Sequence, residues 1–355
     1  MGKRAVVNFR PPYLLYRDEV VRAVTGVLDS GQVLQGEHVR HCERLLTGLT
    51  GKRHAVLFSS ATTAIEALVA HDDAAVVTPT VNFVSLPYAA RKFARPVHLM
   101  RRSRPLSGAM LGGPRGEGVR RWPVALAGQA GVDYERSVGA ADIEDASQCF
   151  LTMTSRGMVG ALGWAGVFSF TFNKAVTAGE GGCVVTDDDE LADRLARYRD
   201  FGRSPSAAIP DRPIDRVGFN YRMSELHAAM LGVQLTHAHQ IAAHMGRLWK
   251  QYEEALGEVG ITPVSDAYDN YSRLIVRVPD GGSDVATVRR TLAVEHGIAT
   301  PTPIMDYSLA ESAGFAGDEE PGWNRLLCLP FWFGLDSADL VYVAEALAQV
   351  LAANA

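Results

Sequence analysis

A lysine at the end of an aromatic, apolar run is the first residue of this chain whose surroundings suggest chemistry. The run Val167-Phe-Ser-Phe-Thr-Phe-Asn ends at Lys174, and a glycine-rich turn, Gly179-Glu-Gly-Gly182, follows. A lysine amine attacks carbonyl groups well when its surroundings disfavour the charged ammonium form. Taken alone, a lysine in such a segment is more often an exposed surface residue. The functional interpretation therefore depends on what other segments supply.

A carboxylate follows another predicted strand, in the run Ile143-Glu-Asp-Ala-Ser-Gln148. A side chain at the carboxyl end of a parallel strand faces the crevice where ligands bind. Asp145 could there keep a pyridine nitrogen protonated, which makes such a ring a better electron sink. The alternative is that Asp145 caps the N-terminus of a helix.

Two further segments each follow a predicted strand. Ser59-Ser-Ala-Thr-Thr-Ala64 leads into a predicted helix, whose free backbone N–H groups and hydroxyls can bind phosphate, although such caps are common without a ligand. Phe83, in Pro79-Thr-Val-Asn-Phe83, could stack on a flat ring, but an aromatic there is more often part of the core. An amine, a carboxylate, a phosphate-binding turn and an aromatic are together the parts of a pyridoxal phosphate (PLP) site.

These four segments, in this order, resemble those of the DegT/DnrJ/EryC1/StrS family of PLP-dependent sugar aminotransferases. The family usually shows a Ser-Gly-Thr-Ala helix start, a Pro-x-x-Thr-Phe/Trp segment, a Glu-Asp-Ala-Ala-Gln run and Ser-Phe-x-x-x-Lys before a Gly-Glu-Gly-Gly turn. Its Gly-x-Asn-Tyr-Arg-Met motif appears here as Gly218-Phe-Asn-Tyr-Arg-Met223. Ser30-Gly-Gln-Val-Leu-Gln-Gly36 and Leu327-Cys-Leu-Pro330 also match, so the resemblance covers nearly the whole chain.

The resemblance implies a role for each matching residue. Lys174 would carry PLP as an internal aldimine, and Asp145 would face its pyridine nitrogen. Gln148 would lie near the ring hydroxyl, and Phe83 would stack on the ring. Asn220 would reach the phosphate of the neighbouring subunit's cofactor, which implies a homodimer with shared active sites. The residues that match phosphate contacts are Ala61, Thr62 and Ser169.

The resemblance also implies a reaction. An amino group would pass from glutamate or glutamine, through Lys174 and PLP, to a keto-sugar (nucleotide-linked in most of the family) or to a keto-cyclitol. One alternative is a dehydratase that deoxygenates sugars with PLP or pyridoxamine phosphate, although such enzymes typically have His in place of the lysine. The other alternative is a cofactor-binding or sugar-binding module without turnover.

Several positions depart from the family pattern. Ala61 stands where the family usually has Gly, and Asn82 replaces the usual Thr. His98-Leu-Met-Arg101 lacks the usual acidic residue. The segment between Met100 and Trp122 is short and rich in Arg and Gly, so the family's helix there is expected to be curtailed or absent. Pro301-Thr-Pro-Ile-Met-Asp306 replaces a His-containing segment. Because these regions shape the substrate side, the cofactor is better defined than the acceptor.

The elements that must position these residues follow from hydrophobic periodicity. Apolar runs alternate with helical patterns over the first two thirds, which predicts crossover units and a mostly parallel sheet covered on both faces. The expected strands are 55–58, 75–77, 96–99, 123–126, 141–143, 167–170 and 182–186. The expected helices are 62–70, 82–93, 188–200, 224–240, 241–256, 285–296 and 337–351, with a late strand at 273–278.

The predicted fold is therefore α/β and of the fold-type-I aminotransferase kind. The pattern changes near residue 240, which predicts a large PLP-binding domain over residues 1–240 and a smaller α+β domain over residues 241–355. Gly112–Gly118 is expected to be a surface loop.

Composition narrows the class of protein. The 355 residues carry a net charge of -5, without the basic stripe of a nucleic-acid-binding protein. Arg101–Arg104 and Arg120–Arg121 are expected to be solvated loop faces. No signal peptide or membrane span is expected, and four cysteines without a CxxC pair favour a reducing cytoplasm. His237, His239 and His244 share a predicted helical segment but lack acidic or cysteine ligands at suitable spacing, so no metal is expected.

Overall fold

The computed structural model describes residues 5–6, 10–103, 106–205, 213–214, 216–301 and 322–353. Seven strands form its centre: β1 (His54–Phe58), β2 (Ala75–Pro79), β3 (Val97–Met100), β4 (Val119–Arg121), β6 (Ile143–Asp145), β9 (Ala165–Ser169) and β10 (Gly182–Thr186). They pair as β3-β2-β4 and as β1-β10-β9-β6. The two sets meet edge to edge, because the Asp145 N–H donates to the Pro123 carbonyl at 2.9 Å and Val124 bridges Asp145 in parallel.

All the central strands but β10 point the same way, and β10 is antiparallel to both of its neighbours, β1 and β9. The predicted mostly parallel α/β sheet is thus confirmed, with one reversed strand. The carboxyl ends of β1, β2, β6 and β9 therefore meet at one edge of the sheet, where ligands bind in open α/β folds.

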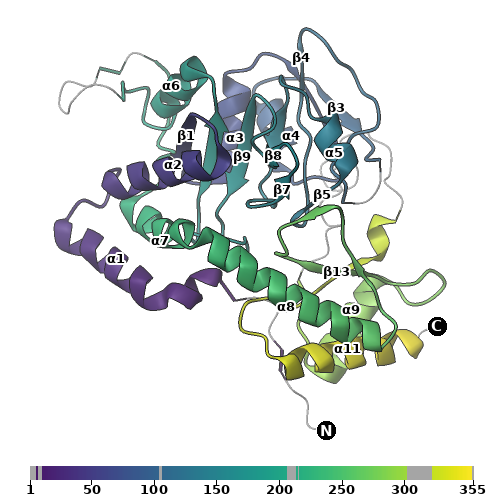
Figure 1. The fold of residues 1–355 in the computed structure, drawn as a ribbon. Helices are drawn as coiled ribbons and strands as arrows, with labels where there is room; N and C mark the ends of the chain where they lie inside the picture. Colours follow the sequence, from purple (N-terminus) through teal and green to yellow (C-terminus); the bar gives the residue numbers. More distant parts are fainter. Residues whose placement is uncertain are drawn as a thin grey trace.

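Helices cover both faces of this sheet (Figure 1). Alternate residues of a strand point to opposite faces. Val167 belongs to an apolar cluster with residues of α3 (Ala61–Ala70), α4 (Ser85–Lys92) and α6 (Asp189–Tyr198). Phe168 belongs to another cluster, with residues of α2 (Glu37–Thr50) and α7 (Glu225–Thr236). This double burial explains why the strands are continuous apolar runs.

A second sheet is built from the later part of the chain. It contains β11 (Pro263–Val264), β13 (Leu274–Arg277) and β14 (Leu326–Leu329), all antiparallel. The helices α8 (Ala238–Glu258), α9 (Val285–His296) and α11 (Ser337–Ala352) lie together beside it (Figure 1). The division at residue 240 stays a prediction, because one apolar cluster runs from α2 and α7 into α8 and α11.

Shorter elements complete the described structure. β12 (Tyr268–Asp269) pairs with β5 (Gln129–Ala130) and so ties the later part of the chain to the earlier part. The others are η1 (Pro12–Tyr16), α1 (Arg17–Ser30), α5 (Val132–Ser137), β7 (Met153–Thr154), β8 (Gly157–Met158) and η3 (Trp323–Arg325). None of the described helices is long and apolar enough to cross a membrane.

The arginines of 101–104 and 120–121 agree only in part with their prediction as solvated loop faces, because Arg101 is exposed whereas Arg102 and Arg121 are buried. Arg120 and Arg121 belong to β4, and Arg121 is 4% exposed. The Arg120 guanidinium donates to Asp72 at 2.6 Å and lies over the Trp164 ring. Arg102 is also buried and donates to the Val81 carbonyl at 2.8 Å. Carbonyls, a carboxylate and a ring thus accompany Arg102 and the partly buried Arg120, whereas the Arg121 guanidinium lies 4.0 Å from the Asp142 carboxylate and makes no hydrogen bond to it.

The structure describes one of the two segments that depart from the family pattern fully enough to test its prediction, and hardly describes the other. In residues 100–103 and 106–128 the structure contains no helix, as expected, and residues 112–118 form an irregular loop that ends in a turn. Of the segment at 301–306, residues 302–306 lie outside the described residues. The predicted helix 224–240 ends earlier, because the chain breaks at His237 between α7 and α8.

Candidate active site

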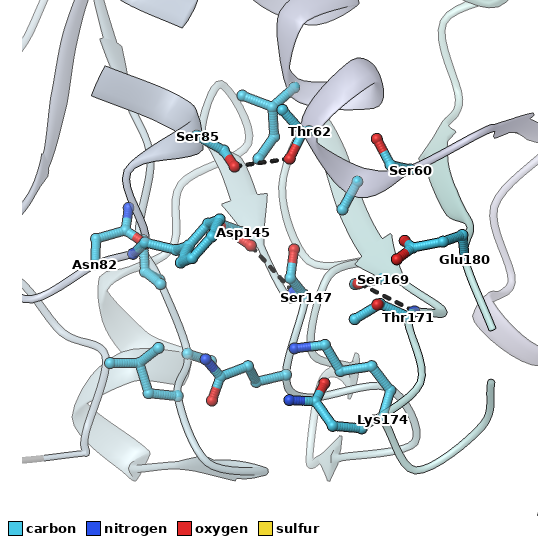
Figure 2. A pocket seen from close by; sticks show the side chains of 18 of the residues that line it. Ser60, Thr62, Asn82, Ser85, Asp145, Ser147, Ser169, Thr171, Lys174 and Glu180 are labelled. Atoms are coloured by element: carbon cyan, nitrogen blue, oxygen red, sulfur yellow. Dashed lines mark hydrogen bonds between the residues drawn. The ribbon is translucent and has the colours of Figure 1, made fainter. Parts of the chain in front are cut away.

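A cavity of about 290 Å³ opens at the edge where β1, β2, β6 and β9 end (Figure 2). Seven of the eight site residues predicted from the sequence line it, from elements far apart in the chain. They are Ala61, Thr62, Phe83, Asp145, Gln148, Ser169 and Lys174.

Lys174 enters the cavity from the turn after β9. Its backbone N–H donates to the Thr171 carbonyl at 3.1 Å, and its side chain extends into the space between the strand ends (Figure 2). Burial, and after it the Arg273 cation, lower the pKa of the Lys174 amine to about 8, although the Asp145 carboxylate opposes both effects. An amine with such a pKa is neutral, and so nucleophilic, far more often at neutral pH than an ordinary lysine.

Asp145 lies at the carboxyl end of β6 and is 5% exposed. Burial raises the pKa of its carboxyl group, while hydrogen bonds from Ser147 and the charges of Lys174 and Arg102 oppose this rise. Its Oδ1 accepts the Ser147 N–H at 3.1 Å. A buried carboxylate of this kind gains from a protonated heterocycle nitrogen as a partner.

The N-terminus of α3 forms a cradle suited to phosphate. Ser60 caps the helix by accepting the Thr63 N–H, and the Thr63 hydroxyl accepts the Ser60 N–H in return. This leaves the N–H groups of Ala61 and Thr62, in the first turn, available to an anion at the positive end of the helix. The Thr62 and Ser85 hydroxyls, 2.8 Å apart, add donors on one side.

Gly182 makes this cradle possible. It begins β10 directly against the start of α3, and a Cβ there would lie far inside van der Waals contact of the Ala61 nitrogen and the Ser60 carbonyl. The last position of the Gly-Glu-Gly-Gly turn thus requires glycine for a steric reason, because the strand and the helix approach each other closely there.

Gln148, Asn82 and Phe83 shape the remaining walls. The Gln148 Oε1 accepts the Ala127 N–H at 2.9 Å, so its amide N–H groups remain as donors to a ligand oxygen. Asn82, which replaces the family's Thr, is buried and bonds the Thr78 hydroxyl at 3.1 Å and the Phe83 N–H at 2.6 Å. It therefore braces the loop that presents Phe83, which is 49% exposed at the cavity wall.

Asn220 does not line this cavity. It is exposed, and its backbone bridges Asp200 in antiparallel fashion. Apolar side chains near it are exposed too, with Val217 at 77% and Phe219 at 40%. The predicted contact with a neighbouring subunit's cofactor stays a prediction.

Several polar residues that line the cavity were not assigned a role from the sequence, among them the five named next. Ser147, Thr171, Asn173 and Glu180 lie inside or beside the motifs quoted above, so position within those motifs was an available signal; Ser85 had no such signal. Asn173 Oδ1 is buried and lacks a hydrogen-bond partner among the described residues. Buried polar atoms without partners are costly, so they suit a site completed by a ligand.

Two histidines near the break between α7 and α8 contact different partners. The His237 ring stacks on Tyr16 with 3.9 Å between centroids, and His244 Nε2 lies 2.9 Å from the Phe333 carbonyl. Within the described ranges, no three His, Cys, Asp or Glu side chains are grouped to hold a metal ion.

The sequence matches the profile of the DegT/DnrJ/EryC1/StrS aminotransferase family over residues 15–99 and 129–348. The chain belongs to this family. The match is interrupted at residues 100–128, which include the short segment rich in Arg and Gly.

Solved structures share the fold. Helicobacter pylori PseC, an aminotransferase involved in the biosynthesis of pseudoaminic acid, matches with a TM-score of 0.84 at 21% identity, over 99% of this chain and 100% of that one. The PLP-form of Spr1654 from Streptococcus pneumoniae, a sugar aminotransferase by its description, matches at 0.82 and 18%, over 98% and 99%. A GDP-4-keto-6-deoxymannose-3-dehydratase with a trapped PLP-glutamate geminal diamine matches at 0.79 and 17%, over 93% and 97%.

The cavity fits PLP part by part. The α3 cradle suits the phosphate, Phe83 offers a face to a ring, and Asp145 suits a ring nitrogen. Lys174 supplies an amine to the same space. This agrees with the cofactor named for the PLP-bound neighbours in the family.

Proposed function

We propose that this chain is a PLP-dependent aminotransferase that moves an amino group from glutamate or glutamine to a keto-sugar, most simply a nucleotide-linked one, or to a keto-cyclitol. The observation that carries the proposal is the placing of Lys174 and Asp145 in one cavity that also contains a helix N-terminus. Membership of a family of sugar aminotransferases supports the acceptor class.

In this mechanism PLP supplies the electron sink that makes the donor Cα–H acidic. Lys174 holds the cofactor at rest. Once the donor amine has replaced it, the Lys174 Nζ, with its lowered pKa, would act as the base that takes the proton from the donor Cα and as the acid that returns it. Asp145 keeps the ring nitrogen protonated, and the Gln148 amide donates to the ring oxygen. Acceptor amination uses the same groups in reverse.

The first experiment reconstitutes the purified protein with PLP. A visible absorption band should form, and borohydride should fix the cofactor on Lys174, as peptide mapping can show. Glutamate or glutamine should convert the bound cofactor to its pyridoxamine form, and a panel of keto-sugars and keto-cyclitols should convert it back. Lys174→Ala should lose at least about 10³-fold in turnover, whereas Lys250→Ala, on the exposed side of α8, should not.

Two results would overturn this proposal. Full turnover by Lys174→Ala would remove the lysine from the mechanism. Stable binding of PLP without conversion by any amino acid would favour the binding module without turnover.

A dehydratase is the second candidate, because a sugar 3-dehydratase is among the structures that share this fold. Its product would be a deoxysugar without new nitrogen, whereas an aminotransferase gives an amino sugar. Mass spectrometry of the product with ¹⁵N-labelled glutamate separates the two reactions. The presence of Lys174 supports amino transfer, since an amine that moves the proton is available.

A further inference from the structure

A second, narrower cavity adjoins the first on the side of the later part of the chain. It shares Ser147, Gln148, Asn173 and Lys174 with the main cavity. Its remaining wall includes Arg273, which immediately precedes β13 and is partly buried. The Lys174 amine therefore lies between the cofactor cavity and an arginine that no sequence motif singled out.

The loop before Arg273 is fixed by the earlier part of the chain. The Asn270 N–H donates to the Gly128 carbonyl at 3.0 Å, and its side-chain amide donates to the Phe150 carbonyl at 2.7 Å. The Asn270 Oδ1 accepts the Ser272 N–H at 3.0 Å. Asn270 is 5% exposed, so these bonds are shielded from water. Arg273 is thus held at the cavity by a rigid loop.

The charge at this wall lacks a counterion. Among the described residues that line the two cavities, Lys174 and Arg273 are the only basic ones. The Arg273 guanidinium makes no hydrogen bond or ion pair with any residue of the described chain, and its charge is felt at Lys174. A partly buried guanidinium with open donors is a binding group for a carboxylate or phosphate.

We infer that Arg273 binds the α-carboxylate of the amino donor. The inference rests on the proposed amino transfer. The donor's Cα must stand where the Lys174 Nζ can reach its proton, and the α-carboxylate is one bond away from that carbon. The carboxylate therefore falls within a few ångströms of Lys174, and Arg273 is the cation on that side. The phosphate cradle lies at α3, so the two anions are held by different groups.

This assignment separates the two halves of the reaction. The donor carries a carboxylate next to its reacting carbon, and the keto-sugar or keto-cyclitol acceptor does not. Arg273 should therefore act on donor binding and leave the acceptor's half of the reaction largely unchanged.

The test compares Arg273→Gln with Arg277→Gln in the PLP-loaded enzyme. Arg277 is the last residue of β13, which Arg273 precedes, but it is exposed and pairs with Asp280 at 2.9 Å, so it is a matched control. Stopped-flow spectroscopy of the conversion by glutamate should show a half-saturating concentration raised about 10–100-fold in Arg273→Gln. Arg273→Lys should recover part of the loss. The conversion of the pyridoxamine-loaded variant by the acceptor should stay within about twofold of wild type.

Two further probes ask whether a carboxylate is what Arg273 recognises. Isothermal titration with glutarate, which cannot react, should show weakened binding to Arg273→Gln and unchanged binding to Arg277→Gln. A primary alkylamine without a carboxylate should convert wild type and Arg273→Gln equally well.

The outcomes distinguish this inference from the proposed function. If wild type converts with glutamate and Arg273→Gln does so with the same half-saturating concentration, Arg273 is not the carboxylate site and amino transfer stands. If both half-reactions slow equally, Arg273 has only a structural role. If no amino acid converts the bound cofactor of the wild type to its pyridoxamine form, the proposed function fails and the inference fails with it.

Discussion

Lys174 retains an amine at a position that disfavours its charge, because the cavity walls remove water from it and Arg273 repels it. The nearby Asp145 carboxylate compensates only in part. An active-site group of this kind has a chemical use and a cost in folding stability. That cost can be measured separately from catalysis, in protein without cofactor.

Lys174→Met should raise the stability of the cofactor-free protein at pH 7. The folded-state pKa is about 8 and the ordinary value is 10.5, so between these values the unfolded chain binds more protons. The lysine's penalty is therefore full below pH 8, on the order of 3 kcal/mol, and disappears as the pH rises through 10.5. Thermal unfolding should show that the gain in melting temperature of Lys174→Met over wild type is smaller at pH 10 than at pH 7. A gain independent of pH would assign the effect to packing instead, and Lys250→Met should give neither.

For single residues, the sequence predicted those cavity residues that lie in short motifs. Lys174, Asp145 and Gln148 follow strand ends whose apolar runs are easily recognised, and the structure brings their side chains to one cavity. Arg273 was not predicted, because it reaches the cavity only through contacts between Asn270 and residues more than a hundred positions earlier. Their roles in the reaction stay predictions until tested.

Among the elements, β10 and the start of α3 depend on each other. The strand passes so close to the helix that only glycine fits at its first position, and the helix presents its N–H groups to the cavity at that point. A side chain at this contact must push the strand and helix apart. Such a displacement should weaken phosphate binding at α3 more directly than it affects the reaction at Lys174.

Gly182→Ala should weaken PLP binding by at least about tenfold, because the α3 cradle must shift. Fluorescence titration of the cofactor-free protein with PLP measures this directly. Gly26→Ala is the control: Gly26 lies in α1, and a Cβ there meets nothing within 4 Å. That change should leave PLP binding unchanged and raise the free energy of unfolding by about 0.5–1 kcal/mol, since alanine favours helix. Unaltered PLP affinity in Gly182→Ala would contradict this account of the cradle.

Elements with strong local patterns were predicted well. The predicted bounds of β10 and α9 agree with the structure, and Ser224 caps α7 as expected. β4 was misplaced because two of its three residues are arginines, and the placing of Arg120 depends on distant partners such as Asp72 and Trp164. Likewise, no local pattern indicates that Glu225 accepts the N–H groups of Gly36, His38 and Val39 at the start of α2.

For the whole molecule, the open question is where Asn220 acts. It lies outside its own chain's cavity, on an exposed segment with exposed apolar side chains. A homodimer in which each Asn220 completes the neighbouring site accounts for a motif residue placed in this way. Twofold symmetric dimers are the commonest closed assembly of identical chains, and their symmetry would make two such shared sites equivalent.

Mixed dimers test this arrangement. Lys174→Ala and Asn220→Ala should each have low activity, but co-expression in equal amounts should restore about one quarter of the wild-type activity. The reason is that half of the dimers are mixed, and each mixed dimer has one site with both native residues. Differently tagged subunits allow the mixed species to be purified and assayed. Activity no higher than the average of the two separate variants would show that the sites are not shared.

The reversed strand also sets the order in which this protein can be completed during synthesis. Among the described strands, β1 pairs only with β10, which lies roughly 130 residues later. At ribosomal rates of about 5–20 residues per second, β1 waits on the order of 10 s for its partner. During that time its edge is open to other chains. Because β10 also closes the cradle at α3, a nascent chain cannot acquire its phosphate site before residues 182–186 have left the ribosome.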